Sequence, residues 1–133
     1  MSENNELSII QKADLVSLIK QGGLITDVPF SHDIFLDSFL VAGTYYVDEI
    51  EEYAESIFMG VELSLVREPK NPADEFAIMV KDKEGHKLGY IPRKMNRIPA
   101  RLMDAGKMLF AKVTECNPGL GTVEIRADLF LKD

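Results

Sequence analysis

Apolar and polar positions recur with two different periods along the chain, and the period changes near residue 60. Residues 6–20 place apolar side chains at helical spacing, and residues 47–60 do the same in an acidic segment that ends in glycine. After this point apolar and polar residues alternate in 61–66 and again in 76–80, which is typical of strands with one buried face. We therefore predict helical segments before residue 60 and a mainly β structure after it.

Further segments extend the predicted sheet. Residues 34–46 are rich in β-branched and aromatic side chains, which favours a largely buried strand with a bulge or a close backbone approach at Gly43. Residues 86–92 follow a glycine-containing turn and predict the return strand of a hairpin. Residues 108–116 and 122–133 predict a last pair of strands. Five or six short strands in one domain favour a small β-barrel, because closure removes exposed sheet edges.

One helix is predicted between strands, over residues 93–105. Asn96 is placed to cap its first turn, where a proline costs no backbone hydrogen bond. The apolar stripe that should face the core consists of Ile98, Leu102 and Ala105. The predicted fold is therefore a small barrel with one inserted helix and one leading helix.

The chain length favours a single domain with a helical extension. At 133 residues the chain can bury one hydrophobic core, and a second core is not assumed. We expect residues 1–33 to form a helix and a linker, and residues 34–133 to form the barrel domain. The broad apolar stripe of the N-terminal helix has to be covered, either by the barrel or by a protein partner.

Composition and cysteine content favour a cytoplasmic protein. The chain is 46% hydrophobic and 28% charged, which is typical of a globular domain. No segment approaches the roughly 18 uninterrupted apolar residues of a membrane span, so we expect no membrane association. The single Cys116 excludes an intrachain disulfide and fits a reducing compartment.

Charge is unevenly distributed along the sequence. The net charge of -7 argues against nucleic acid, but residues 1–60 hold 11 of the 22 acidic residues and only two lysines. Residues 81–112 hold nine basic residues against three acidic ones. Two explanations are open: the acidic and basic parts attract each other within the fold, or the basic part binds an acidic partner.

The sequence REPKNPAD at residues 67–74 connects two predicted strands. It is longer than the roughly two to five residues of an ordinary hairpin loop, and its two prolines restrict the backbone. Two interpretations are open. Asn71 and Asp74 can bond to local backbone groups in Asx turns, or a rigid rim presents the Asp74 carboxylate and Arg67 to a ligand.

Four motifs together resemble the HIRAN family. Within roughly residues 35–116 they are VAGTYY at 41–46, LVREPKNPADEFAIMV at 65–80, GHKLGYIPR at 85–93 and ARLMDAG at 100–106. The resemblance implies a small OB-like or SH3-like β-barrel. From the eukaryotic members it further implies a pocket for the 3′-hydroxyl end of single-stranded DNA.

The family motifs imply a set of nucleic-acid contacts. In DNA-binding members these come from a tyrosine on the first strand, from the aspartate of an N-P-x-D motif and from residues after a G-x-I/L step. In this sequence the motifs imply Tyr45 or Tyr46, Asp74 and the segment from Tyr90 to Arg93. With Arg67 from the rim and the neighbouring Lys94, the predicted nucleic-acid-binding residues are Tyr45, Tyr46, Arg67, Asp74, Tyr90, Arg93 and Lys94. Either tyrosine fits the motif. Three positions differ from the DNA-binding members: Ala73 replaces an aromatic residue, and Phe76 and Tyr90 stand where other members have polar or basic residues.

The chemistry of these residue types fits a strand end. A terminal 3′-hydroxyl can donate a hydrogen bond, and an ionised carboxylate such as Asp74 is an acceptor only. On a strand, Tyr45 and Tyr46 would point to opposite faces, so that one could stack on a base while the other enters the core. Arg93, Arg97 and Arg101 recur every four residues along one edge of the predicted helix. Two interpretations are open: they bind phosphates in a row, or they form an ordinary solvated face of the helix.

Alternative functions come from other classes. We expect no enzyme, cofactor or metal site, because His32 and His86 lack metal-ligand spacing and Cys116 in a predicted strand is expected to be a buried, inert thiol. A protein-interaction module is the main alternative to DNA binding. It would keep the fold and bind a partner through the N-terminal helix.

Overall fold

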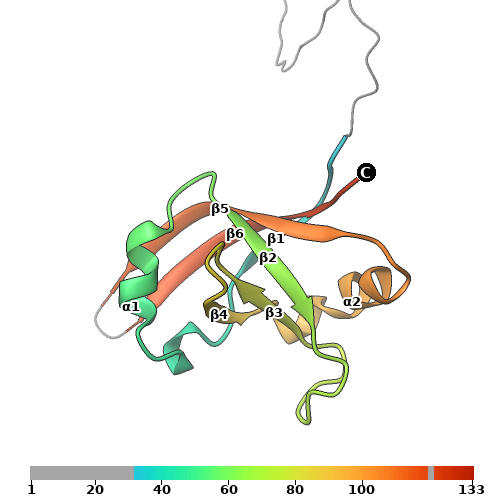
Figure 1. Ribbon diagram of the computed structural model, residues 1–133, viewed down its shortest axis with the longest axis horizontal. Coiled ribbons are helices and arrows are strands. Elements are labelled where there is room, and N and C mark those ends of the chain that lie inside the picture. The colour runs from blue at the N-terminus through green and yellow to red at the C-terminus, as the bar shows by residue number, and fades with distance from the viewer. Residues whose placement is uncertain (1–31, 120–121) are drawn as a thin grey trace, which may run out of the picture. The chain divides into compact units, whose positions relative to one another are not determined.

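The computed structural model describes residues 32–119 and 122–133, which fall in one compact unit (Figure 1). Its strands are β1 (Ile34–Leu40), β2 (Glu62–Arg67), β3 (Ile78–Lys81), β4 (Lys87–Tyr90), β5 (Leu109–Pro118) and β6 (Val123–Leu131). Its helices are α1 (Ile50–Tyr53) and α2 (Arg97–Asp104), with 3-10 turns η1 (Thr44–Tyr46), η2 (Ala54–Ser56) and η3 (Arg93–Met95). The predicted helix at 6–20 and most of its linker lie outside the described residues.

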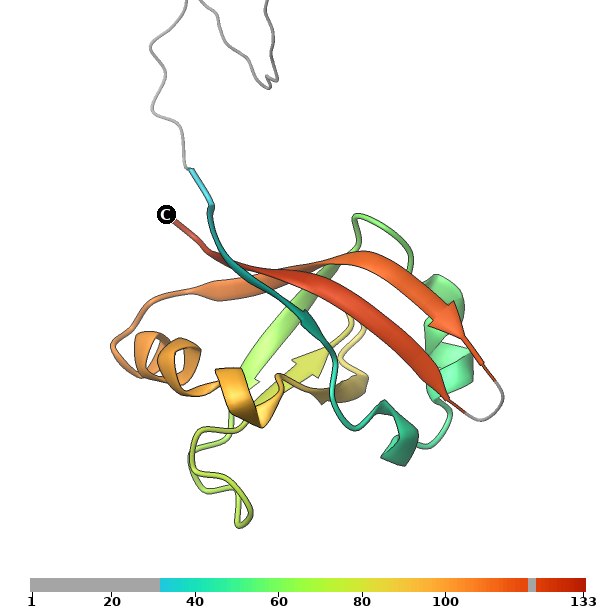
Figure 2. The ribbon, with the colours of Figure 1, turned by 180° about the vertical axis from the view of Figure 1, so that it is seen from behind.

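All six strands form one antiparallel sheet in the order β1-β6-β5-β2-β3-β4. The sheet curls, and the chain that follows β1 continues along β6 and then reaches β4, the strand at the opposite end of the sheet (Figures 1 and 2). Val41 donates its N–H to the Ile125 carbonyl of β6 at 2.8 Å, and Ala42 exchanges two 2.8 Å backbone hydrogen bonds with Tyr90 of β4. These bonds close the curled sheet, and the predicted mainly β, barrel-like fold is confirmed.

Closure requires a glycine in β4. A Cβ added to Gly89 would overlap the carbonyl oxygen of Ala42 and lie 2.7 Å from Cγ1 of Val41. Backbone atoms cannot move aside without breaking the Ala42–Tyr90 bridge, so only glycine allows this close approach. The prediction of a bulge or a close backbone approach at Gly43 is wrong, because a Cβ at Gly43 would meet nothing within 4 Å, and the close approach occurs at Gly89 instead.

The core fills the inside of the curled sheet. Alternate residues of the strands point inward, and the fully buried side chains include Leu63, Ile78, Val80, Leu88, Ile125 and Leu129. Phe39 and Val41 add to this core from the first strand and its extension. α1 contributes Ile50, η2 contributes Ala54 and the residue after η2 is the buried Ile57, while α2 contributes Ala100. The predicted acidic helix at 47–60 is thus present as two short helical turns.

Two local predictions are wrong. Residues 34–46 were expected to form one largely buried strand, but β1 ends at Leu40 and most of its side chains are exposed, because only one of its faces packs on the core. In α2 the expected stripe fails at Ile98, which is 71% exposed, and at Ala105, which is also exposed, while Pro99 and Ala100 are buried instead. The helix is only eight residues long, so its orientation is set by its contacts at both ends and not by its apolar periodicity. Among the described residues, no helix has the length and apolar content needed to cross a membrane.

Candidate nucleic-acid interface

The loop between β2 and β3 is stabilised by its own polar side chains. Asn71 accepts hydrogen bonds at Oδ1 from the N–H groups of Ala73 (2.8 Å) and Asp74 (3.2 Å), and its amide donates to Glu68 Oε1 at 2.9 Å. The Asn71 N–H also donates to the Glu68 carbonyl at 3.0 Å. Together with two prolines, these bonds define the backbone that leads to Asp74.

The Asp74 carboxylate is held from two directions. Oδ1 accepts the Phe76 N–H at 2.9 Å, and Oδ2 accepts the Asn96 side-chain amide at 2.7 Å and lies 3.6 Å from Arg93 Nε. The Phe76 N–H, the Asn96 amide and the Arg93 charge lower the pKa of this carboxyl, and partial burial opposes them only in part. The side chain is 18% exposed, so an ionised, hydrogen-bond-accepting group faces solvent at a fixed position.

Three distant segments form one pocket beside Asp74. It measures about 290 Å³, at the lower end of ligand-site volumes. The lining residues are Ala42, Gly43, Asn71, Ala73, Asp74, Ala77, Tyr90, Ile91 and Arg93. The Ala42–Tyr90 bridge that closes the sheet brings two of these segments together, and the β2–β3 loop supplies the third. The pocket is therefore a direct product of barrel closure.

Tyr90 and Arg93 differ in how firmly the protein holds their polar groups. The Tyr90 hydroxyl donates to Glu68 Oε1 at 2.8 Å, and this bond adds to the Asn71 bond that lowers the pKa of Glu68. Arg93 donates to the Ala73 carbonyl and lies beside Asp74, but most of its side chain is exposed. Tyr90 thus forms a fixed wall, and Arg93 places a positive charge at the pocket mouth.

Tyr45 and Tyr46 follow the pocket residue Gly43 after one intervening residue, Thr44. Gly43 adopts a left-handed conformation (φ 78°), and η1 begins at the next residue. Both rings are exposed, at 69% and 85%, and they meet edge to face with centroids 5.4 Å apart. The prediction that the tyrosines occupy opposite strand faces is wrong, because a 3-10 turn does not alternate its side chains as a strand does. Thr44 is buried instead and donates to the Val123 carbonyl at 2.7 Å.

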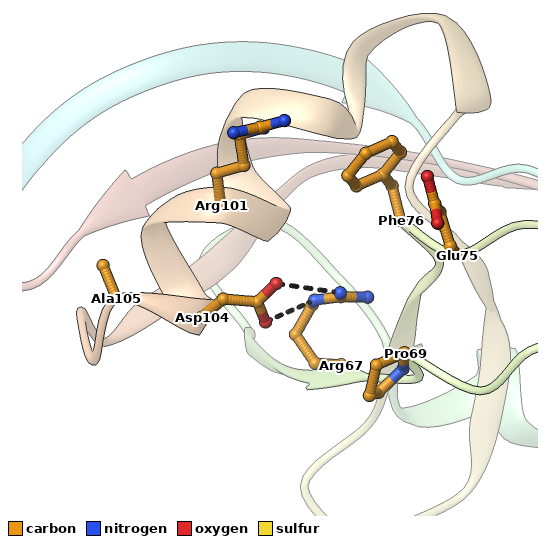
Figure 3. Close-up of a pocket in the computed structure, with 7 residues that line it drawn as sticks. All are labelled: Arg67, Pro69, Glu75, Phe76, Arg101, Asp104 and Ala105. Carbon is orange, nitrogen blue, oxygen red and sulfur yellow. Dashed lines mark hydrogen bonds and ion pairs between the residues drawn. The ribbon is translucent and has the colours of Figure 1, made fainter.

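Arg67 and Lys94 lie outside this pocket. Arg67 forms a bidentate ion pair with Asp104, at 2.9 Å and 3.0 Å (Figure 3). It also donates to the Ala77 carbonyl at 2.8 Å, and its side chain is only 12% exposed. Lys94 is exposed and lines an apolar groove between β1 and α2. Of the seven residues implied by the sequence, the structure brings three into one pocket and two next to it.

Sequence reasoning missed Asn96 as a site residue. It was expected to cap α2, but its side chain makes no capping bond and donates to Asp74. Its burial is nearly complete, at 3% exposure. An asparagine before a helix signals a cap, and nothing local in the sequence reports a partner 22 residues earlier.

Two other candidate sites, a cluster of possible metal ligands and the single cysteine, are explained by their local surroundings. Asp82, Glu84 and His86 place possible metal-ligand atoms within 4.8 Å of one another. However, Asp82 accepts hydrogen bonds from the N–H groups of Glu84 and His86 and contacts His86 Nδ1 at 2.9 Å. These local bonds stabilise the turn between β3 and β4 and account for the position of Asp82. Cys116 in β5 is half-buried, and burial raises the pKa of its thiol, so that the reactive thiolate is disfavoured.

Comparison with known proteins identifies the family. The profile of the HIRAN domain matches residues 35–132, about three quarters of the chain. This chain belongs to the HIRAN domain family. The match continues beyond the predicted limit of residue 116 and includes both strands of the last hairpin. No match to a protein of curated function was found.

Solved structures agree with the HIRAN assignment. A protein from Lactobacillus plantarum is 32% identical, with a TM-score of 0.72, and the alignment covers 78% of this chain and 99% of that one. The HIRAN domain of human HLTF is 19% identical in its crystal structure, with a TM-score of 0.57 and coverage of 75% and 78%. Its NMR structure is 20% identical, with a TM-score of 0.50 and coverage of 76% and 80%. The likeness to the human domain supports the HIRAN fold.

Proposed function

We propose that this HIRAN domain binds the 3′-hydroxyl end of single-stranded DNA in the pocket beside Asp74. The observation that carries the proposal is an ionised carboxylate, fixed by two hydrogen-bond donors, in the wall of a pocket of about 290 Å³. A carboxylate accepts hydrogen bonds and donates none, so it favours a ligand group that can donate. A terminal hydroxyl is such a group, and an internal phosphodiester is not.

Asp74 keeps capacity for a ligand. An ionised carboxylate has about four acceptor positions, and Asp74 uses two of them in hydrogen bonds to Phe76 and Asn96. Arg93 lies near Oδ2, which leaves Oδ1 with room for one more donor. A 3′-phosphate in the same position would bring further negative charge against the carboxylate, which is unfavourable. The pocket therefore suits an unphosphorylated end.

The surrounding residues supply the remaining contacts. Arg93 can bind the phosphate that precedes the terminal nucleoside through a charge-assisted hydrogen bond. Tyr45 and Tyr46 are exposed beside Gly43 and can stack on bases, which contributes about 1–3 kcal/mol per base. These contacts do not read sequence, so we infer recognition of an end and not of a base order. Lys94 and Arg67 would act outside the pocket, by general attraction for phosphate and by supporting the loop.

Family membership supports the same ligand. The motifs shared with DNA-binding HIRAN domains include the tyrosine pair, Asp74 and the segment after Gly89. Ala73 replaces an aromatic residue, so we expect weaker stacking than in those members. The domain would serve DNA repair or end processing in the cytoplasm as a binding module without catalysis.

The proposal is tested by fluorescence anisotropy with short oligothymidylates that end in a 3′-hydroxyl or a 3′-phosphate. The natural chain should prefer the hydroxyl by about tenfold, the value of one charge-assisted hydrogen bond. Asp74→Asn keeps the shape but can turn an N–H toward the ligand, and it should remove this preference. Glu124→Gln, on the outer face of β6, is the matched control. Equal binding of the two ends by the natural chain would refute the proposal.

The alternative of a protein-interaction module makes a different prediction. In that case the N-terminal segment would hold a partner, and neither oligonucleotide would bind. A pull-down with and without residues 1–30 compares the two ideas directly. An unchanged set of partners after truncation would remove the N-terminal segment as the interaction site.

A further inference from the structure

The loop that carries Asp74 separates two hollows. Ala73, Asp74 and Ala77 line the end pocket, and Glu75 and Phe76 line a second hollow of about 600 Å³. The remaining walls of the second hollow are Arg67, Pro69, Arg101, Asp104 and Ala105 (Figure 3). Because Asp74 and Phe76 are joined by a 2.9 Å hydrogen bond, the two hollows meet at this loop.

Phe76 supports two arginines of α2. The guanidinium carbons of Arg97 and Arg101 lie 5.3 Å and 5.9 Å from the centre of its ring. Both arginines are exposed, and across residues 32–119 and 122–133 neither forms an ion pair with a carboxylate. A guanidinium packed on a ring face keeps its N–H edge free for a phosphate. The two charges are thus held beside the ring, and Arg101 also has an acidic neighbour, Asp104, whose pKa it helps to lower.

The helix that carries these arginines is fixed at both ends, to Asp74 of this loop and to Arg67 at the end of β2. At its start, the Asn96 amide binds Asp74 at 2.7 Å. At its end, Asp104 forms the bidentate ion pair with Arg67, which is also bonded to the Ala77 carbonyl (Figure 3). Arg97 and Arg101 therefore have a fixed position relative to the end pocket.

We propose that a single strand whose 3′ end occupies the Asp74 pocket continues over Phe76 along α2, where Arg97 and Arg101 bind successive phosphates. This inference rests on the proposed function and adds a second part to the binding surface. Four residues of α-helix advance by about 6 Å, a spacing that suits neighbouring phosphates of an extended strand. Arg93, in the turn η3 that leads into α2, adds a further positive charge at the pocket mouth.

The test compares oligothymidylates of two and of eight nucleotides, both with a 3′-hydroxyl, at several salt concentrations. The natural chain should bind the longer strand about tenfold more tightly, since two added phosphate contacts contribute charge-assisted hydrogen bonds. Arg97→Ala combined with Arg101→Ala should abolish this gain. The slope of log affinity against log salt for the longer strand should fall by about 1.4, because each phosphate on a single strand contributes about 0.7.

Arg126→Ala removes one exposed positive charge from the outer face of β6 and is the control for net charge. The gain with length should survive in this variant. An equal gain in the natural chain and in the double variant would overturn the proposed track. A preference for the 3′-hydroxyl without any gain in affinity for the longer strand would overturn the track and still support the end pocket. A gain that depends on the two arginines, without preference for the 3′-hydroxyl, would support the track and overturn the end pocket.

Discussion

Asn96 donates a 2.7 Å hydrogen bond from its side-chain amide to Oδ2 of Asp74, across 22 residues of sequence. The donor is almost completely buried and comes directly before α2, whereas the acceptor lies on the loop between β2 and β3. This bond therefore fixes the orientation of the carboxylate and at the same time attaches the arginine-bearing helix to the loop. Pocket and helix are parts of one connected polar structure.

Asn96→Ala should destabilise the domain and loosen Asp74. A partly buried carboxylate that loses its donor costs about 1–3 kcal/mol, so the free energy of unfolding should fall by this amount in urea titrations. The preference for a 3′-hydroxyl should also fall, because Asp74 is no longer held in one orientation. Asn117→Ala, which removes an exposed amide bonded to Glu115, is the control and should change stability by less than about 0.5 kcal/mol. Equal stability of the two variants would contradict the structural role of Asn96.

The strands and the barrel could be predicted from the sequence because they depend on local alternation. Residues 61–66 and 76–80 show the period of two, and the inward side chains Leu63, Ile78 and Val80 are fully buried as alternation requires. The family motifs also located the pocket residues Asp74, Tyr90 and Arg93, although no local rule states that they meet.

The remaining site could not be predicted because it depends on contacts distant in sequence. Arg67 was assigned to a ligand, but its partner Asp104 lies 37 residues later and pairs with both arms of its guanidinium. Tyr45 and Tyr46 were placed on a strand, but closure through Ala42 ends the strand and the left-handed Gly43 starts a 3-10 turn. Both outcomes follow from how the sheet closes, and the periodic pattern of apolar residues carries no information about which distant segments meet.

Gly89→Ala should impair closure of the sheet. The added methyl group would overlap the Ala42 carbonyl and crowd Val41, so the bridge between the chain after β1 and β4 would have to open. We expect a loss of about 1–3 kcal/mol in the free energy of unfolding, as for other overpacking changes, and a loss of end binding because the pocket is formed by this bridge. Gly119→Ala is the control, since its Cβ would make only ordinary 3.6 Å contacts with Thr122. Thermal melting that affects both variants alike would argue against a special role for Gly89.

The free energy of unfolding should fall at acid pH because Glu68 and Asp74 become protonated. Hydrogen bonds from Asn71 and from the Phe76 N–H, respectively, hold the pKa of these carboxyls below their ordinary values of 4.5 and 3.8. The unfolded chain therefore takes up protons at a higher pH than the folded one, so the stabilisation is complete above the ordinary values and is lost as pH falls through the lowered ones. Urea titrations between pH 3 and pH 7 should show a steep decline below about pH 4. Glu68→Gln with Asp74→Asn should flatten this decline, whereas Glu124→Gln should leave its slope unchanged; a slope that is equally steep in the double variant would contradict the assignment.

Tyr45→Ala and Tyr46→Ala should weaken binding of single strands without lowering stability. Both rings are exposed, at 69% and 85%, so their removal leaves the core intact, and urea midpoints should stay at the natural value. If either ring stacks on a base, its loss should cost about 1–3 kcal/mol in affinity, or roughly 5- to 150-fold in anisotropy titrations. Phe58→Ala removes another exposed ring, 64% accessible and outside the pocket lining, and it should leave affinity unchanged. An equal loss from all three substitutions would indicate a general effect of surface aromatic residues, and no loss from either tyrosine would exclude η1 from the interface.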